Sequence, residues 1–171
     1  DTPNTAPLFP AGAAVLVDLV DEALAPGPGD VVLDAYAGGG LFGLTVGRNA
    51  AHLLAIESSP LGVDDLVFNA RAAGIRGRIE EGTVEQVAGG LEDEWTVAVV
   101  DPPRTGLGKD GVAAVTRTRP RSIAYVSCDP AALARDTRLL ADTGYRLEWA
   151  APVDMFPQTF HIETVASFVA G

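Results

Sequence analysis

The sequence has little cysteine and little positive charge. Cys128 is the single cysteine in 171 residues, so an internal disulfide is excluded, and no cysteine or histidine pair has the spacing of a structural zinc site. This usage is typical of a reducing cytoplasm. The 12 Lys and Arg against 23 Asp and Glu give a formal net charge of -11, so the overall field repels phosphates and acidic membranes. Contact with nucleic acid must therefore be local or depend on another part of a complex.

Long apolar runs are also absent. The sequence has no run of 18 apolar residues and no basic segment followed by an apolar one, which argues against a membrane span and a secretory signal. Aromatic residues make up only 6%, yet 47% of the residues are hydrophobic and 20% are charged, which is typical of a soluble globular protein. The length fits one domain. Residues 1–8, which contain two prolines, are predicted to be a linker stub.

Short apolar runs alternate with helical patterns along the rest of the chain. Residues 31–33, 53–56, 97–100 and 123–126 have the composition of strands that are buried on both faces. Helical spacing predicts helices at 12–25, 41–49, 61–73, 111–118 and 131–143. The alternation predicts right-handed βαβ units and a mostly parallel sheet. Residues 145–150 and 164–170 are two more strand candidates, and they predict a terminal hairpin with an antiparallel strand at one edge.

A glycine-rich turn follows the first predicted strand. Gly38, Gly40 and Gly43 form a G-x-G-x-x-G pattern, in which glycine lets the backbone approach a ligand. Glu57 ends the second strand, 23 residues after Asp34, where a carboxylate can accept hydrogen bonds from both ribose hydroxyls. The pattern fits NAD or S-adenosylmethionine, and Asp34, which can face an amino-acid ammonium, favours the latter. A tight turn beside a solvated glutamate is the alternative without a ligand.

Polar residues also follow the fourth and fifth predicted strands. Asp101 and Arg104 stand at the carboxyl edge of the sheet, where open α/β folds bind ligands. Five of the 12 basic residues fall within 104–121, which indicates either a phosphate-facing patch or a solvated helix face. Cys128 precedes a helix that Asp129 can cap, and the helix dipole favours a thiolate there while the Asp129 carboxylate opposes it. An inert, buried cysteine is the alternative.

The segment 154–164 mixes aromatic, amide and ionisable side chains before the last strand. Such loops over a rigid sheet often carry function. Glu163 is a candidate proton acceptor, and His161 is a candidate pocket wall or hydrogen-bond donor. A glutamate on an edge strand in water is the alternative.

Four segments of the sequence resemble the S-adenosylmethionine-dependent RNA uridine carbon-5 methyltransferases, which make 5-methyluridine in transfer and ribosomal RNA. The segments are 34–38, 101–104, 127–136 and 154–164, and they occur in the order and approximate spacing of that family. The resemblance implies an α/β fold of the class I methyltransferase type: a Rossmann-like three-layer sandwich around a seven-stranded, mostly parallel sheet with an antiparallel edge strand. It also implies that residues 9–171 are the catalytic domain, without the amino-terminal RNA-binding modules of the family.

The resemblance further implies a site and a reaction. Cys128 would be the nucleophile that adds to carbon 6 of a flipped uridine in tRNA or rRNA, and Glu163 would remove the proton from carbon 5. No metal is implied. The implied cofactor, S-adenosyl-L-methionine, would be bound by Asp34, Tyr36, Gly38, Gly40, Glu57, Thr83 and Asp101. The implied substrate-binding residues are Arg104, Phe156 and His161.

The sequence departs from the family at three places. A Phe-x-Gln segment that is usual in the family has no Gln here after Phe9, and Ala37 and Asp129 stand where many members have Cys and Asn. Three other functions stay open. They are an NAD-dependent oxidoreductase that uses the same glycine loop, a non-catalytic cofactor-binding module of the same fold, and a hydrolase that pairs Cys128 with His161 but lacks an oxyanion signature.

Overall fold

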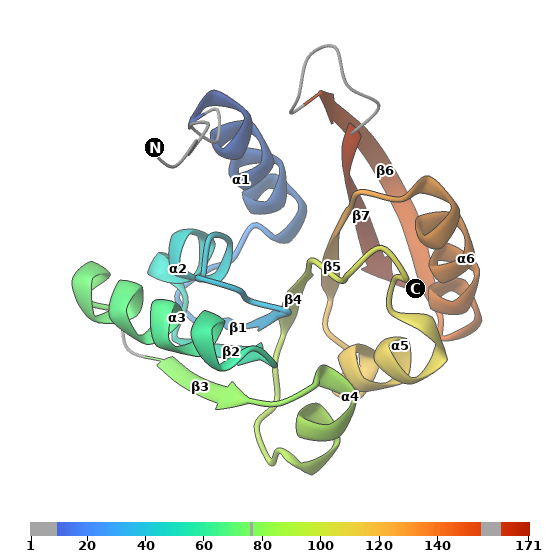
Figure 1. The fold of residues 1–171 in the computed structure, drawn as a ribbon. Helices are drawn as coiled ribbons and strands as arrows, with labels where there is room; N and C mark the ends of the chain where they lie inside the picture. The colour runs from blue at the N-terminus through green and yellow to red at the C-terminus, as the bar shows by residue number, and fades with distance from the viewer. Residues whose placement is uncertain (1–9, 76, 155–161) are drawn as a thin grey trace.

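The computed structural model describes residues 10–75, 77–154 and 162–171. Seven strands form one sheet in the order β3-β2-β1-β4-β5-β7-β6 (Figure 1). The strands are β1 (Val31–Ala35), β2 (His52–Glu57), β3 (Gly77–Glu81), β4 (Val97–Val100), β5 (Ser122–Ser127), β6 (Tyr145–Asp154) and β7 (Ile162–Ala170). The helices of a turn or more are α1 (Pro10–Leu24), α2 (Gly43–Val46), α3 (Pro60–Ala73), α4 (Val84–Val87), α5 (Gly108–Thr116) and α6 (Pro130–Asp142).

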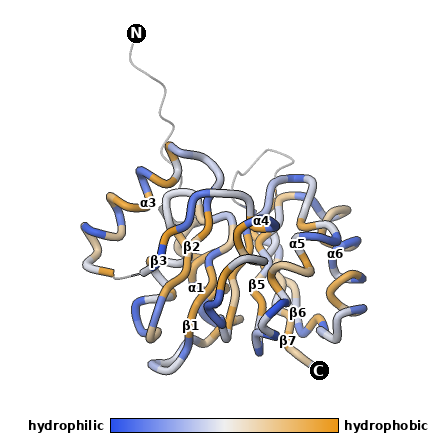
Figure 2. Tube along the Cα trace, turned by 90° about the horizontal axis from the view of Figure 1, so that it is seen from below, coloured by the Kyte–Doolittle hydropathy of each residue, from blue (hydrophilic) through white to orange (hydrophobic). Residues whose placement is uncertain are grey.

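The sheet is sandwiched between two layers of helices. The strands β1, β2, β4 and β5 are almost wholly apolar, and Figure 2 shows them as an apolar centre. Their side chains point alternately to two core clusters, one with Leu16 of α1 and Leu66 of α3, the other with Val112 of α5 and Leu140 of α6. The predicted three-layer α/β sandwich is therefore confirmed.

The terminal hairpin is also confirmed. Strand β7 runs antiparallel to both of its neighbours, β5 and β6, and β6 forms the edge of the sheet. Because β7 runs against the parallel strands, it begins at the edge where they end. We call this the carboxyl edge, and the opposite side the amino edge. The hairpin thus brings the start of the last strand to the ends of β1, β4 and β5.

Strand β3 and helix α4 lie outside the predicted elements. Strand β3 occupies the other edge of the sheet and contains Arg78, Glu80 and Glu81 rather than an apolar run. Charged residues are usual on edge strands because they discourage pairing with other chains. In the described parts of the chain, no helix has the length and apolarity needed to cross a membrane.

Candidate active site

The sheet register brings the predicted site residues to the carboxyl edge. Asp34 is the fourth residue of β1, and Asp101 immediately follows β4. In the antiparallel pair of β5 and β7, Ser127 lies opposite Thr164. Cys128 and Glu163 are the next residues along the chain beyond this last pair, so both lie at the carboxyl edge. Opposed residues in such pairs have Cα atoms about 4.5–5.5 Å apart.

Asp34 is a buried carboxyl group with one partner. Its Oδ2 accepts a hydrogen bond of 2.8 Å from the Gly43 N–H, whereas Oδ1 has no hydrogen-bond partner among the described residues. Burial, together with the charges of Asp101 and Glu57, raises the pKa of Asp34 to about 7 against the lowering effect of the hydrogen bond from Gly43. A Cβ at Gly43 would lie 2.5 Å from Oδ2, so this position requires glycine. The closeness of Gly43 to Asp34 explains the last glycine of the G-x-G-x-x-G pattern.

Glu57 connects the glycine turn to the start of α3. Its Oε2 accepts a hydrogen bond from the Gly38 N–H at 2.8 Å, and its Oε1 accepts one from the Ser59 N–H at 2.7 Å. Gly62 packs against this side chain, since a Cβ there would lie 2.9 Å from Glu57 Cγ. Gly40 has a φ of 90° and equally little room for a side chain. The turn is thus fixed in place around the Glu57 carboxylate.

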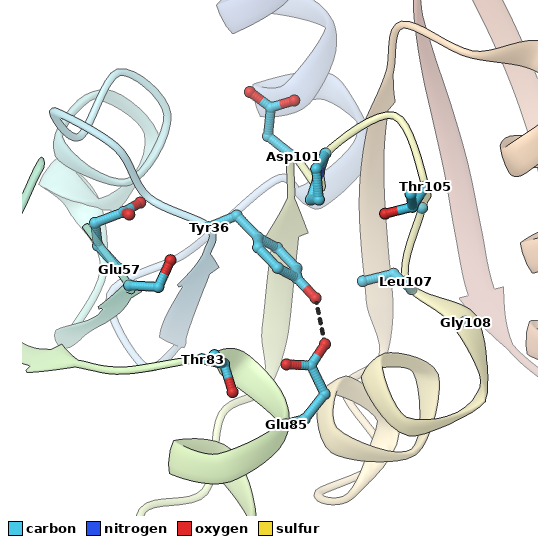
Figure 3. Close-up of a pocket in the computed structure, with 11 residues that line it drawn as sticks. Tyr36, Glu57, Thr83, Glu85, Asp101, Thr105, Leu107 and Gly108 are labelled. Atoms are coloured by element: carbon cyan, nitrogen blue, oxygen red, sulfur yellow. Dashed lines mark hydrogen bonds between the residues drawn. The ribbon is translucent and has the colours of Figure 1, made fainter.

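A cavity of about 650 Å³ opens beside this turn. It is lined by Tyr36, Glu57, Ser58, Thr83, Glu85, Asp101, Pro103, Thr105, Gly106, Leu107 and Gly108. Figure 3 shows that the Tyr36 hydroxyl points at Glu85, to which it donates a hydrogen bond of 2.9 Å. Three of the described lining residues are carboxylic acids and none is a lysine or arginine. The cavity therefore favours a cationic ligand over a phosphate-bearing one.

Asp101 and Glu163 form a pair of like charges at the same edge. Burial, together with the charge of the Glu163 carboxylate, raises the pKa of Asp101 to about 7. The Asp101 side chain nevertheless reaches the solvent of the open cavity. In Figure 3 its carboxylate points away from the Tyr36–Glu85 pair. Asp101 thus lines the cavity and lies near Glu163 at the start of β7.

Cys128 is a partly exposed, free cysteine at the amino end of α6. The Asp129 carboxylate caps this helix, accepting a hydrogen bond of 2.8 Å from the Ala132 N–H. Ser127 Oγ accepts a hydrogen bond of 3.1 Å from the Asp129 N–H and fixes the turn that carries Cys128. The predicted cap is confirmed, and Cys128 is not buried.

Not every predicted residue reaches the cavity. Arg104 is exposed and is not one of the described lining residues. Phe156 and His161 lie outside the described residues. A phosphate-facing patch at 104–121 is wrong as one surface, because Arg121 lies at the amino edge, where it pairs with Asp30 at 2.8 Å. Arg117, in the same span, stacks on Trp95 at 4.6 Å.

Two acidic residues near the cavity were not predicted from the sequence. Glu85 belongs to α4, a short element with no long periodic pattern that could have revealed it. Asp136 is fully buried, and its spacing gave a usable signal. It stands between Ala132 and Leu140 at intervals of four, so a carboxylate falls on the apolar face of α6. Among the described residues, no three His, Cys, Asp or Glu are placed to share a metal ion.

Comparisons with known proteins point to one family. A family model described as tRNA (Uracil-5-)-methyltransferase matches residues 91–169. An RNA methyltransferase of Streptomyces coelicolor, whose activity is uncharacterised, is 45% identical over 165 residues, covering 93% of this chain and 35% of that protein. A similar protein of Caldanaerobacter subterraneus is 40% identical over 143 residues, covering 80% of this chain and 31% of that protein. The chain spans about a third of the length of these relatives.

Solved structures share the fold. The Pyrococcus abyssi tRNA (uracil-54, C5)-methyltransferase, in complex with S-adenosyl-L-homocysteine, superposes with a TM-score of 0.76 at 30% identity, covering 91% of this chain and 38% of that one. A precorrin-6y C5,15-methyltransferase of Geobacter metallireducens gives a TM-score of 0.77 at 16% identity, covering 93% of this chain and 87% of that one, which shows a common fold alone.

Proposed function

Since the chain belongs to the tRNA (uracil-5-)-methyltransferase family of RNA methyltransferases, we propose that residues 9–171 form a domain that transfers a methyl group from S-adenosyl-L-methionine to carbon 5 of a uridine in RNA. One observation carries this proposal. Cys128, Glu163 and the acidic cavity that includes Asp101 lie together at the carboxyl edge of the sheet. A nucleophile, a base and a site for a cationic ligand are what the reaction requires.

The cavity suits S-adenosyl-L-methionine chemically. The cofactor carries a sulfonium and an ammonium, and the carboxylates of Asp101 and Glu57 in the cavity wall can interact with positive charge. Asp34, which the resemblance also implies as a cofactor ligand, is buried and is not one of the described lining residues. Glu57 has further acceptor capacity for ribose hydroxyls, and Tyr36 and Thr83 add a ring and a hydroxyl to the wall. The pyrophosphate of NAD would instead face three carboxylates. Gly38 and Gly40 belong to the turn that Glu57 holds, and neither is one of the described residues lining the cavity.

When bound, the cofactor supplies an electrophilic methyl group. The Cys128 thiolate forms a bond from Sγ to carbon 6 of the uracil, and the electron pair of the carbon 5–carbon 6 double bond makes carbon 5 nucleophilic. After carbon 5 is methylated, Glu163 accepts its proton, the electrons of the C–H bond restore the double bond, and the bond between Sγ and carbon 6 breaks. Cys128 leaves as a thiolate, ready for another cycle.

The charge of the chain bears on how RNA would bind. With a net charge of -11, this domain is a poor phosphate-binding surface. We therefore assign most phosphate contacts to the part of the longer relatives that this chain does not span, while this domain holds the flipped uridine with Arg104, Phe156 and His161. The reaction needs a reduced Cys128, which fits the cytoplasm.

The covalent step can be tested with RNA that contains 5-fluorouridine. Fluorine at carbon 5 cannot leave as a proton, so the adduct should persist and appear as a mass increase of the protein in the presence of S-adenosyl-L-methionine. Cys128 is the single cysteine, so Cys128→Ala should abolish both the adduct and methylation. Glu163→Gln should accumulate the adduct on ordinary uridine RNA. An adduct in Cys128→Ala, or normal turnover in Glu163→Gln, would contradict the assignment.

Two measurements serve as controls. Glu148→Gln removes a partly exposed carboxylate of β6 that pairs with Arg146, and it should methylate like the wild type. Calorimetry should show binding of S-adenosyl-L-homocysteine and none of NAD. Because the pKa of Asp101 is raised to about 7, binding of S-adenosyl-L-methionine, which unlike S-adenosyl-L-homocysteine carries a sulfonium charge, should release protons to the buffer near pH 7.

A further inference from the structure

Helix α6 contains a buried carboxylate that the proposed chemistry does not use. Asp136 is fully buried and lies two turns after Cys128. Its Oδ2 accepts hydrogen bonds from the Leu107 N–H at 2.6 Å and the Tyr125 hydroxyl at 2.8 Å. Its Oδ1 accepts bonds from the Gly108 N–H at 3.2 Å and from Arg135 Nε and Nη2 at 2.9 and 2.7 Å. One carboxylate therefore organises donors from three separate elements.

The backbone that Asp136 holds is a wall of the cavity. Thr105, Gly106, Leu107 and Gly108 all line it. Arg135, which is paired with Asp136, also donates a hydrogen bond of 2.7 Å from Nη2 to the Thr105 carbonyl. The wall packs closely on this pair, because a Cβ at Gly106 would clash with Asp136 Oδ2. Gly106 and Gly108 have φ values of 71° and 64°, a conformation that other residues rarely adopt.

The energetics favour a positioning role over a general contribution to packing. A carboxylate on the apolar face of a helix costs free energy unless charged or polar donors surround it. An apolar residue at 136 would leave the N–H groups of Leu107 and Gly108 without their acceptor in the interior. Asp136 itself is not one of the described residues lining the cavity. Its contacts therefore act on the wall and not on a ligand.

We propose that Asp136, supported by Arg135, is a positioning residue that fixes the Thr105–Gly108 wall of the cofactor cavity to the helix that begins beside Cys128. The inference rests on the proposed function for the identity of the ligand. Because α6 begins two residues after Cys128 and contains Asp136, one helix connects the turn that carries the nucleophile to this wall. Loss of the carboxylate should loosen the wall and weaken cofactor binding while the rest of the sheet stays folded.

Asp136→Asn tests this proposal with little change in volume. An amide has one oxygen to serve the donors that two carboxylate oxygens serve now. Hydrogen exchange at the Leu107 and Gly108 amides should accelerate by at least about tenfold, and the Kd for S-adenosyl-L-homocysteine should rise by about tenfold or more. The matched control is Leu140→Ala, which creates a cavity one turn further along α6. It should lower the Tm without changing exchange at the wall or the Kd.

The outcomes separate the two proposals. An unchanged Kd in Asp136→Asn, or an equal loss of affinity in Leu140→Ala, would overturn the positioning role. If the wild-type chain does not bind S-adenosyl-L-homocysteine, the proposed function fails, and the exchange rates alone still decide whether Asp136 holds the wall. If Asp136→Asn does not fold, Arg135→Gln replaces it, because Arg135 is half-exposed. That variant should raise the Kd about two- to fivefold, and an unchanged Kd would again overturn the role.

Discussion

The two edges of the sheet hold aspartates in opposite electrostatic environments. At the amino edge, Asp30 accepts hydrogen bonds from Arg121 at 2.8 Å and from the Thr96 hydroxyl at 2.7 Å. The hydrogen bond from Arg121 lowers the pKa of Asp30 to about 2, against the effect of burial. At the carboxyl edge, Asp34 is buried with an unpaired oxygen, and burial raises its pKa to about 7. The charged form of aspartate is therefore stabilised at the amino edge, before β1, and destabilised at the carboxyl edge, near the end of β1.

This difference separates a structural edge from a binding edge. The ion pair of Asp30 stabilises the fold. Asp34 destabilises it, because ionising a buried carboxyl with few partners is unfavourable. A rise in pKa from 3.8 to about 7 corresponds to about 4 kcal/mol at most. Carboxyl groups with such a raised pKa are typical of functional sites, and Asp34 packs against Gly43 of the glycine turn beside the cavity.

The largest effect should come from Asp34→Asn, which removes the ionisable group. Since the pKa of Asp34 is raised in the fold, its stability contribution is complete below about pH 4 and is lost as the pH rises to about 7. Asp34→Asn should therefore be more stable than the wild type at pH 8, by about 2 kcal/mol after allowing for an unpaired amide N–H. Urea unfolding at pH 4, 6 and 8 measures this difference. Asp101, whose pKa is also raised, is still present in this variant, so part of the pH dependence of the free energy of unfolding should remain.

Ser167→Ala is the matched control. The Oγ of Ser167 is also buried and has no hydrogen-bond partner within the part of the chain that the structure describes. Ser167 lies in register with Asp34 across the sheet, with β4 and β5 between them. Because a hydroxyl does not titrate in this range, its effect on the free energy of unfolding should not vary with pH. If the free energy of unfolding of Asp34→Asn varied with pH as much as that of the wild type, the raised pKa of Asp34 would not be the source of the pH dependence.

A smaller effect is expected at the amino edge, from Arg121→Gln. The pKa of Asp30 is lowered in the fold, so its stabilisation is present above about pH 4 and is lost as the pH falls through 2. Arg121 is about half exposed, so the loss should be about 1 kcal/mol at pH 7 and should vanish near pH 2. Thermal unfolding across this range measures it. Binding of S-adenosyl-L-homocysteine should not change, and a large loss of affinity would show that the edges are coupled.

The sequence predicted the central strands well because their apolar runs are short and unambiguous. The strands β1, β2, β4 and β5 are buried on both faces, and local composition is enough to identify them. Strand β3 escaped prediction because an edge strand can be charged, and α4 escaped because one helical turn has too few residues to show a period.

The site was predictable where a residue stands next to a strand end. Asp34, Glu57 and Asp101 follow from this rule together with the glycine pattern. The proximity of Cys128 to Glu163 depends on the antiparallel register of β7, which no local pattern specifies. The same holds for Asp136, whose partners lie 28 and 29 residues away in sequence. Long-range pairing is what the sequence alone left undetermined.

The smallest effect should come from Asp129→Asn, which reduces the negative charge of the carboxyl edge beside Cys128. Asparagine caps a helix about as well as aspartate, so the free energy of unfolding should change by only a few tenths of a kcal/mol. Less repulsion of the thiolate should speed alkylation of Cys128 by iodoacetamide about two- to fivefold at pH 7, as measured by intact mass. Asp142→Asn, at the other end of α6, should react like the wild type. Equal alkylation rates in the wild type, Asp129→Asn and Asp142→Asn would mean that the Asp129 carboxylate caps α6 and has no effect on the reactivity of the neighbouring thiol.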